Sequence, residues 1–145
     1  MPSRAVNGQR RLLLLLDADT TLHPFIQAAL RRAPHAPLRH LECHAVVHPD
    51  ELRNHLRQRR YHVALLSLES AGHPTWPLLE NAHRALQLVQ EASRTHRPSL
   101  VAMTSVGTTA HREAILRLGF AGYLCKPFTL ATLYHEMATA LRLTL

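Results

Sequence analysis

The stretch Gly119-Phe120-Ala121-Gly122-Tyr123-Leu124-Cys125-Lys126-Pro127-Phe128-Thr129 decides the fold that we expect for this chain. It predicts the end of a helix, a short buried strand and an abrupt turn into another helix. A glycine just past an apolar helical pattern can take the left-handed conformation that closes the helix. Lysine before proline is driven out of the helical region, and an X-Pro bond can be cis at modest cost. Thr129 stands where a hydroxyl can cap the helix that follows.

Lys126 is the only lysine of the chain, and every other strongly basic residue is an arginine. Lysine presents a compact ammonium on a flexible stem, whereas arginine presents a planar fork of donors. A lysine kept at the tip of a buried strand therefore indicates that a single compact cation is needed there.

Five predicted strands alternate with five predicted helices along the chain. Apolar runs predict strands over Leu12–Leu16, Leu38–Val47, Val63–Leu68, Leu100–Met103 and Ala121–Leu124. Helical spacing of apolar residues predicts helices over His23–Arg32, Pro49–Leu56, Leu78–Ala92, Thr109–Leu118 and Leu130–Leu141. This alternation is typical of an α/β domain with a parallel sheet covered on both faces. We expect one domain over 11–145 after a disordered leader over 1–10.

Composition excludes several other classes of protein. The formal net charge of +7 suggests an acidic partner or nucleic acid, but the arginines are scattered and lack the interleaved aromatics of a single-strand binder. Cys43 and Cys125 have neither disulfide nor zinc spacing, so we expect small buried residues in a reducing cytoplasm. No apolar run reaches the length of a membrane span.

Polar side chains gather where the predicted strands end, at the edge where open α/β sheets place their sites. They are Asp17, Ala18 and Asp19 after the first strand, Ser67 at the third, Thr104 at the fourth and Lys126 after the fifth. With the segment from Gly119 to Phe128, this set resembles the receiver domain of two-component response regulators. The resemblance covers nearly the whole chain. It implies a flavodoxin-like three-layer sandwich with five strands in the order 2-1-3-4-5.

The chain also departs from the family pattern, which makes it an atypical receiver without the phosphoacceptor aspartate. Ser67 stands where the family has that aspartate, Ala18 replaces one of two acids, and Asp19 comes one place late. Mg²⁺ is usually anchored by carboxylates, and phosphoryl transfer needs an ionised nucleophile. We therefore expect a degenerate phosphorylation site made of Asp17, Ala18, Asp19, Ser67, Thr104 and Lys126, with no catalytic residue and no cofactor. Asp17 and Asp19 are the only candidates for a stray cation.

Without a phosphate, we expect Lys126 to pair with Asp17, with Asp19 or the Ser67 hydroxyl as further partners, because a partly buried ammonium needs compensation.

The resemblance also implies a switch and an interaction face. Thr104 and Tyr123 match the family's switch pair, in which phosphorylation draws the hydroxyl inward and the aromatic ring follows. Tyr123 could equally be a half-buried tyrosine of an edge strand. We assign Tyr123, Pro127 and Tyr134 to a face formed by the fourth helix, the fifth strand and the fifth helix. Through this face we expect a protein partner or a homodimer, while nucleic acid would be contacted only through another domain or chain.

The sequence therefore predicts a phosphorylation-independent, receiver-like interaction module of bacterial two-component signalling, and not an enzyme. One alternative is an active receiver phosphorylated on Asp19 or Glu69, and another is a basic nucleic-acid-binding regulator. A nucleotide or flavin binder is disfavoured, because the segment 17–21 has no glycine to admit a phosphate against the backbone.

Overall fold

The computed structural model describes residues 11–93 and 96–143, so the expected leader over 1–10 lies outside the described residues. Five parallel strands form one sheet in the order β2-β1-β3-β4-β5, which confirms the predicted topology. They are β1 (Leu12–Leu16), β2 (Glu42–Val46), β3 (Val63–Ser67), β4 (Ser99–Thr104) and β5 (Gly122–Cys125).

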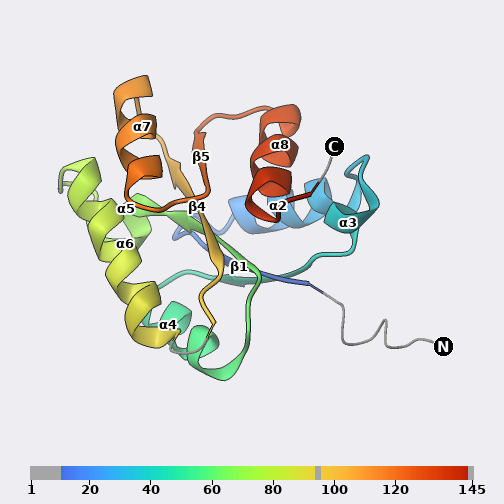
Figure 1. Ribbon diagram of the computed structural model, residues 1–145, viewed down its shortest axis with the longest axis horizontal. Helices are drawn as coiled ribbons and strands as arrows, with labels where there is room; N and C mark the ends of the chain where they lie inside the picture. The colour runs from blue at the N-terminus through green and yellow to red at the C-terminus, as the bar shows by residue number, and fades with distance from the viewer. Residues whose placement is uncertain (1–10, 94–95, 144–145) are drawn as a thin grey trace.

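Helices cover both faces of this sheet (Figure 1). They are α2 (Leu22–Arg31), α3 (Ala36–Arg39), α4 (Pro49–Gln58), α5 (Leu68–Ala71), α6 (Leu78–Ala92), α7 (Thr109–Arg117) and α8 (Leu130–Ala140). One buried cluster joins the sheet to α4, α5, α6 and α7, and a second joins it to α2, α3 and α8. The chain is therefore the three-layer sandwich that the sequence predicts.

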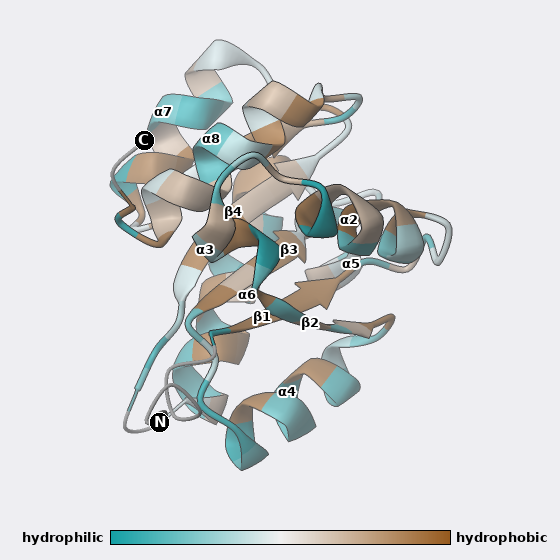
Figure 2. Cartoon of the chain, turned by 90° about the vertical axis from the view of Figure 1, so that its right-hand side faces the viewer, coloured by the Kyte–Doolittle hydropathy of each residue, from teal (hydrophilic) through white to brown (hydrophobic). Residues whose placement is uncertain are grey.

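The burial of the strands follows from their place between two layers of helices. The leucines at 13–16 of β1 are fully buried, and every residue of β3 is buried. β2 is only half-buried along most of its length, as expected of the edge strand that its alternating sequence predicts. Figure 2 shows hydrophilic and hydrophobic colours mixed along β2, and the hydrophobic colour on β1.

The helix ends confirm several local predictions. Thr129 accepts a hydrogen bond from the Thr132 amide at the start of α8. Pro49 occupies the first turn of α4 together with two acidic residues. Gly119, just after α7, has φ of +113°, and the Lys126-Pro127 bond is cis. β5 thus runs between the end of α7 and the capped start of α8.

Three expectations differ from the structure. The second strand begins at Glu42 and not at Leu38, because 36–39 form the single helical turn α3 with a proline in its first turn. The third strand ends at Ser67, and Leu68 opens the short helix α5. Cys125 is exposed and Cys43 is partly buried, so the prediction that both thiols are buried was wrong for Cys125, which stands at the open end of an edge strand.

In the part of the chain that the structure describes, none of the helices combines the length and hydropathy needed to cross a bilayer.

Candidate functional site

The sheet brings the polar side chains from its strand ends to one edge. Ser67 is in register with Met103, and Thr104 is in register with Cys125. Asp17 is 3% exposed, Ser67 2% and Thr104 0%. A buried carboxylate of this kind needs a partner, because desolvation disfavours its charged form.

Lys126 supplies that partner. Its Nζ lies 2.6 Å from Oδ2 of Asp17, and the lysine side chain is 26% exposed. The ion pair expected from the sequence is therefore present. It joins the first strand to the turn after the fifth strand, across the middle of the sheet.

The second carboxylate oxygen of Asp17 accepts a hydrogen bond from a nearby backbone amide. The Asp19 amide donates to Asp17 Oδ1 at 2.8 Å, and His23 Nε2–H donates to the Asp17 carbonyl at 2.8 Å. These contacts hold the loop between β1 and α2 against the site.

Asp19 directs its carboxylate hydrogen bonds to Thr21. Its Oδ1 accepts from the Thr21 hydroxyl at 2.6 Å and from the Thr21 amide at 3.0 Å. These hydrogen bonds, first from the side chain and then from the backbone, lower the pKa of Asp19. Asp19 thus supports the turn before α2. It forms no ion pair with Lys126 in the described structure, although the charge of Lys126 further lowers the pKa of Asp19.

The carboxylates at this edge do not fit Mg²⁺. Mg²⁺ is held by one or two carboxylates in octahedral oxygen geometry. Here one oxygen of Asp17 faces an ammonium and the other accepts an amide, while Asp19 is turned to Thr21. Among residues 11–93 and 96–143 no cluster of three or more His, Cys, Asp or Glu side chains is placed to hold a metal ion.

Thr104 has an acidic partner that sequence reasoning considered only as an alternative phosphoacceptor. Its hydroxyl donates to Glu69 Oε2 at 2.5 Å and accepts from the Val106 amide at 3.2 Å. Next to Glu69, Ser70 Oγ accepts from the Ala18 amide at 3.0 Å. The short helix α5 therefore ties the third strand to the ends of the first and fourth strands.

Asn81 of α6, which is 1% exposed, holds the loop that follows α5. Asn81 Oδ1 accepts from the His73 amide at 2.8 Å, and its Nδ2 donates to the His73 carbonyl at 2.9 Å. Gly72 packs so closely that a Cβ there would lie 1.9 Å from Asn81 Oδ1. The loop after α5 is thus held by a buried amide, and Glu69 is presented to Thr104 in a defined position.

Ser67 ends β3 beside these groups, but its hydroxyl neither caps α5 nor bonds to Lys126 or Asp17 in the described structure. The expectation that Ser67 binds Lys126 was therefore wrong.

Tyr123 of β5 points into the fold and is 6% exposed. A Cβ at Gly107 would lie 1.4 Å from the Tyr123 hydroxyl, so this inward position requires glycine at 107. The hydroxyl has no hydrogen-bond partner in the described structure. Burial raises the pKa of Tyr123, and Cys125 and Glu69 add to that rise.

Pro127 and Tyr123 line one groove of about 510 Å³ beside β5. Its other lining residues are Gly107, Thr108, Thr109, Arg112, Cys125, Phe128, Thr129 and Thr132. Tyr134 lies elsewhere: its hydroxyl donates to the Ala29 carbonyl of α2 at 2.7 Å, and it packs in the α2/α3/α8 cluster. The structure thus brings Pro127 and Tyr123 together and separates Tyr134 from them.

No family model and no curated protein matches the chain. Solved structures do match. A signal receiver domain of a two-component histidine kinase from Clostridium thermocellum is 13% identical, with a TM-score of 0.68 over 92% of this chain and 98% of that one. The chain has the receiver-domain fold.

Two further matching structures have a magnesium ion or a phosphorylated aspartic acid. A receiver domain of a sensor histidine kinase from Pseudomonas aeruginosa has magnesium coordinated in its active-site cleft. It is 20% identical, with a TM-score of 0.67 over 91% of this chain and 98% of that one. A response regulator from Burkholderia pseudomallei has a phosphorylated aspartic acid. It is 13% identical, with a TM-score of 0.62 over 90% of this chain and 69% of that one. In the present receiver fold, the third strand ends in Ser67.

Proposed function

We propose that this chain is a receiver-like regulatory module of bacterial two-component signalling that works without phosphorylation. It acts in the cytoplasm by binding a protein partner and is not an enzyme. The fold supports the receiver class, and Ser67 at the end of β3 supports the loss of phosphorylation.

The contact between Glu69 and Thr104 carries this proposal. In receiver domains, the phosphoryl group draws the hydroxyl at the end of the fourth strand inward. Here the carboxylate of Glu69, an anionic acceptor within the same chain, already binds that hydroxyl. Tyr123, the other member of the switch pair, is correspondingly buried. The chain thus holds the switch pair inward with its own side chain.

The groups around Ser67 do not favour phosphoryl transfer. A serine hydroxyl needs a base, because it carries no charge at neutral pH. Lys126 is neutralised by Asp17, and both carboxylate oxygens of Asp17 already accept a hydrogen bond. The site therefore lacks both the positive charge of a metal ion and the negative charge of a phosphoacceptor aspartate, and the two losses offset each other.

The output surface is the groove beside β5, between α7 and α8. Arg112 and four threonines give it donors and hydroxyls, while Phe128 and Pro127 give it apolar contacts. Because Tyr123 also lines this groove, its inward position sets the shape of the surface that a protein partner or a second copy of the chain would contact.

Incubation with acetyl phosphate and Mg²⁺, followed by intact mass spectrometry, tests the proposal. We expect no phosphoryl adduct on the wild-type chain. The matched control is the double variant Ala18→Asp, Ser67→Asp, which restores both carboxylates and should acquire a labile adduct. A labile adduct on the wild type would overturn the proposal, and its location on Glu69 or Asp19 would establish the active-receiver alternative.

A further inference from the structure

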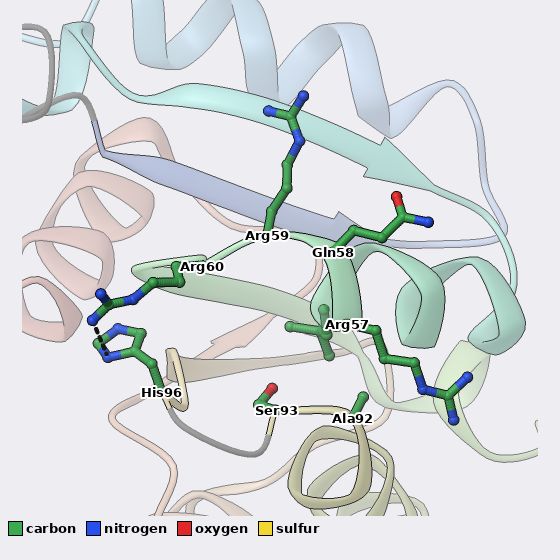
Figure 3. Close-up of a pocket in the computed structure, with 8 residues that line it drawn as sticks. Arg57, Gln58, Arg59, Arg60, Ala92, Ser93 and His96 are labelled. Carbon is green, nitrogen blue, oxygen red and sulfur yellow. Dashed lines mark hydrogen bonds between the residues drawn. The ribbon is translucent and has the colours of Figure 1, made fainter.

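A basic depression of about 390 Å³ lies at the opposite edge of the sheet from Ser67 and Thr104 (Figure 3). It is formed where α4 leads into β3 and where α6 ends before β4. Its lining residues are Leu56, Arg57, Gln58, Arg59, Arg60, Ala92, Ser93 and His96. Three arginines line it, and none of these lining residues is acidic.

Ser93, just after α6, is a buried polar residue without a partner. It is 6% exposed, and its Oγ is buried and makes no hydrogen bond in the described structure. Figure 3 shows this hydroxyl turned toward the segment 57–60. An unpaired buried hydroxyl costs free energy, and it calls for an explanation such as an absent ligand.

Arg60 and His96 form one wall of the depression. Arg60 Nη2 lies 3.3 Å from His96 Nδ1. Because a guanidinium can only donate, Nδ1 accepts in this contact, and the neutral ring then carries its proton on Nε2. Arg60, His96 Nε2–H and the Ser93 hydroxyl therefore all offer donors. A ligand for this set has to be rich in acceptors, and an anion fits best.

A second basic depression of about 460 Å³ adjoins the first and shares His96 with it. Its other lining residues are Arg11, His62, Arg97, Ser99, Ala140, Leu141 and Arg142, again without an acid. Burial, followed by the positive charges of Arg11, His96 and Arg60, lowers the pKa of His62. The positive potential of this edge therefore acts on the side chains that the structure places there.

We propose that this edge binds a phosphate-bearing anion, with one phosphate over the first depression and a further phosphate over the adjoining one, the two meeting at His96. Arginine binds phosphate with two parallel hydrogen bonds, and His96 and Ser93 offer further donors along the first depression. The source is a small polyphosphate compound or the backbone of a nucleic acid. This site is independent of the proposed signalling role, because it lies at the other end of the strands.

Calorimetric titration with sodium tripolyphosphate tests the site on the full chain. We expect saturable binding that Arg60→Gln weakens by about tenfold or more, since a charge-assisted hydrogen bond is lost. Ser93→Ala should also weaken binding, although it removes an unpaired buried hydroxyl and should leave the thermal midpoint unchanged or raised. The matched control is Arg84→Gln on α6, which changes the net charge equally but lies outside both depressions.

The outcomes separate the site from a purely structural role. The arginines also offset the partial negative charge at the ends of α4 and α6, and that role alone would leave tripolyphosphate binding equal in Arg60→Gln and Arg84→Gln. Equal binding in all variants, or no binding at millimolar tripolyphosphate, would overturn the proposal. A short DNA duplex that competes with tripolyphosphate would identify a nucleic acid as the source. Tripolyphosphate binding without duplex binding would identify a small compound.

Discussion

Two carboxylates at the site edge each bind a polar side chain from another strand end. Asp17 pairs with Lys126, and Glu69 binds Thr104. A buried ion pair adds little net stability, but removing one partner leaves an uncompensated charge. Each of these pairs therefore depends on both of its members, which makes single substitutions informative.

Replacement of Glu69 by alanine tests its hydrogen bond with Thr104. The substitution leaves the fully buried Thr104 hydroxyl without its acceptor, so we expect a loss of about 1–3 kcal/mol in the free energy of unfolding. Urea denaturation at neutral pH measures it. Glu80→Ala, on the exposed side of α6, is the control for losing an acid. If the double variant Glu69→Ala, Thr104→Val lost as much as the two single changes added together, the pair would not be coupled.

At the scale of the elements, Glu136 of α8 protects the open edge of the sheet. Its Oε1 accepts from the Tyr123 amide at 2.7 Å, and Arg112 of α7 contacts both Glu136 Oε1 at 3.3 Å and the Tyr123 carbonyl at 3.4 Å. β5 is an edge strand, and unpaired edge groups invite pairing with another chain. Glu136 and Arg112 thus satisfy the outward backbone of Tyr123 and join α7, β5 and α8.

Glu136→Ala should destabilise the contact among α7, β5 and α8 more than Glu136→Gln does. Alanine leaves the buried Tyr123 amide without its acceptor and removes one of the two acceptors of the Arg112 guanidinium. This costs about 1–3 kcal/mol, whereas glutamine keeps an oxygen for the Tyr123 amide. Hydrogen exchange of the Tyr123 amide should accelerate strongly in the alanine variant and weakly in the glutamine variant. Glu113→Ala on α7 is the control, and equal exchange in all three variants would contradict this assignment.

The sequence predicted the long elements well because they repeat their pattern over several turns or strand positions. The helices α3 and α5 have only one turn each, and a single pair of apolar residues three apart cannot distinguish a turn from a strand. For α5, that pair is Leu68 and Ala71, both buried. The partner of Glu69 could not be found from local pattern, because its contact with Thr104 depends on how α5 is held against β4.

At the scale of the whole molecule, the fold gathers charges that are scattered in the sequence. Arginines from distant segments meet at the amino-terminal edge of the sheet; they are Arg11, Arg57, Arg59, Arg60, Arg97 and Arg142. Along the sequence these arginines are scattered. A parallel sheet brings all its strand starts to one edge, so the residues preceding each strand become neighbours. The sequence predicted the same effect for the site residues at the strand ends but not for these arginines.

His62 makes this basic edge sensitive to pH. Its Nδ1 accepts a hydrogen bond from the Leu12 amide at 3.1 Å, which requires the neutral ring. Burial first, and then Arg11, His96 and Arg60, lower its pKa from the ordinary value of 6.5. Between the lowered pKa and 6.5 the unfolded chain binds more protons than the folded chain, so stability should rise with pH in that window. In His62→Asn this rise should be smaller, because asparagine can accept from the Leu12 amide without titrating.

Urea midpoints measured across this window for wild type and His62→Asn check the prediction, and their difference cancels the other histidines. Parallel curves for the two proteins would show that His62 titrates in the folded state as it does in the unfolded chain. Tripolyphosphate supplies a further check. An anion bound over the depression that His62 lines would favour the protonated ring and raise its pKa toward 6.5. The wild-type curve should then approach that of the variant when tripolyphosphate is present, which links the acid sensitivity of the fold to occupancy of its basic edge.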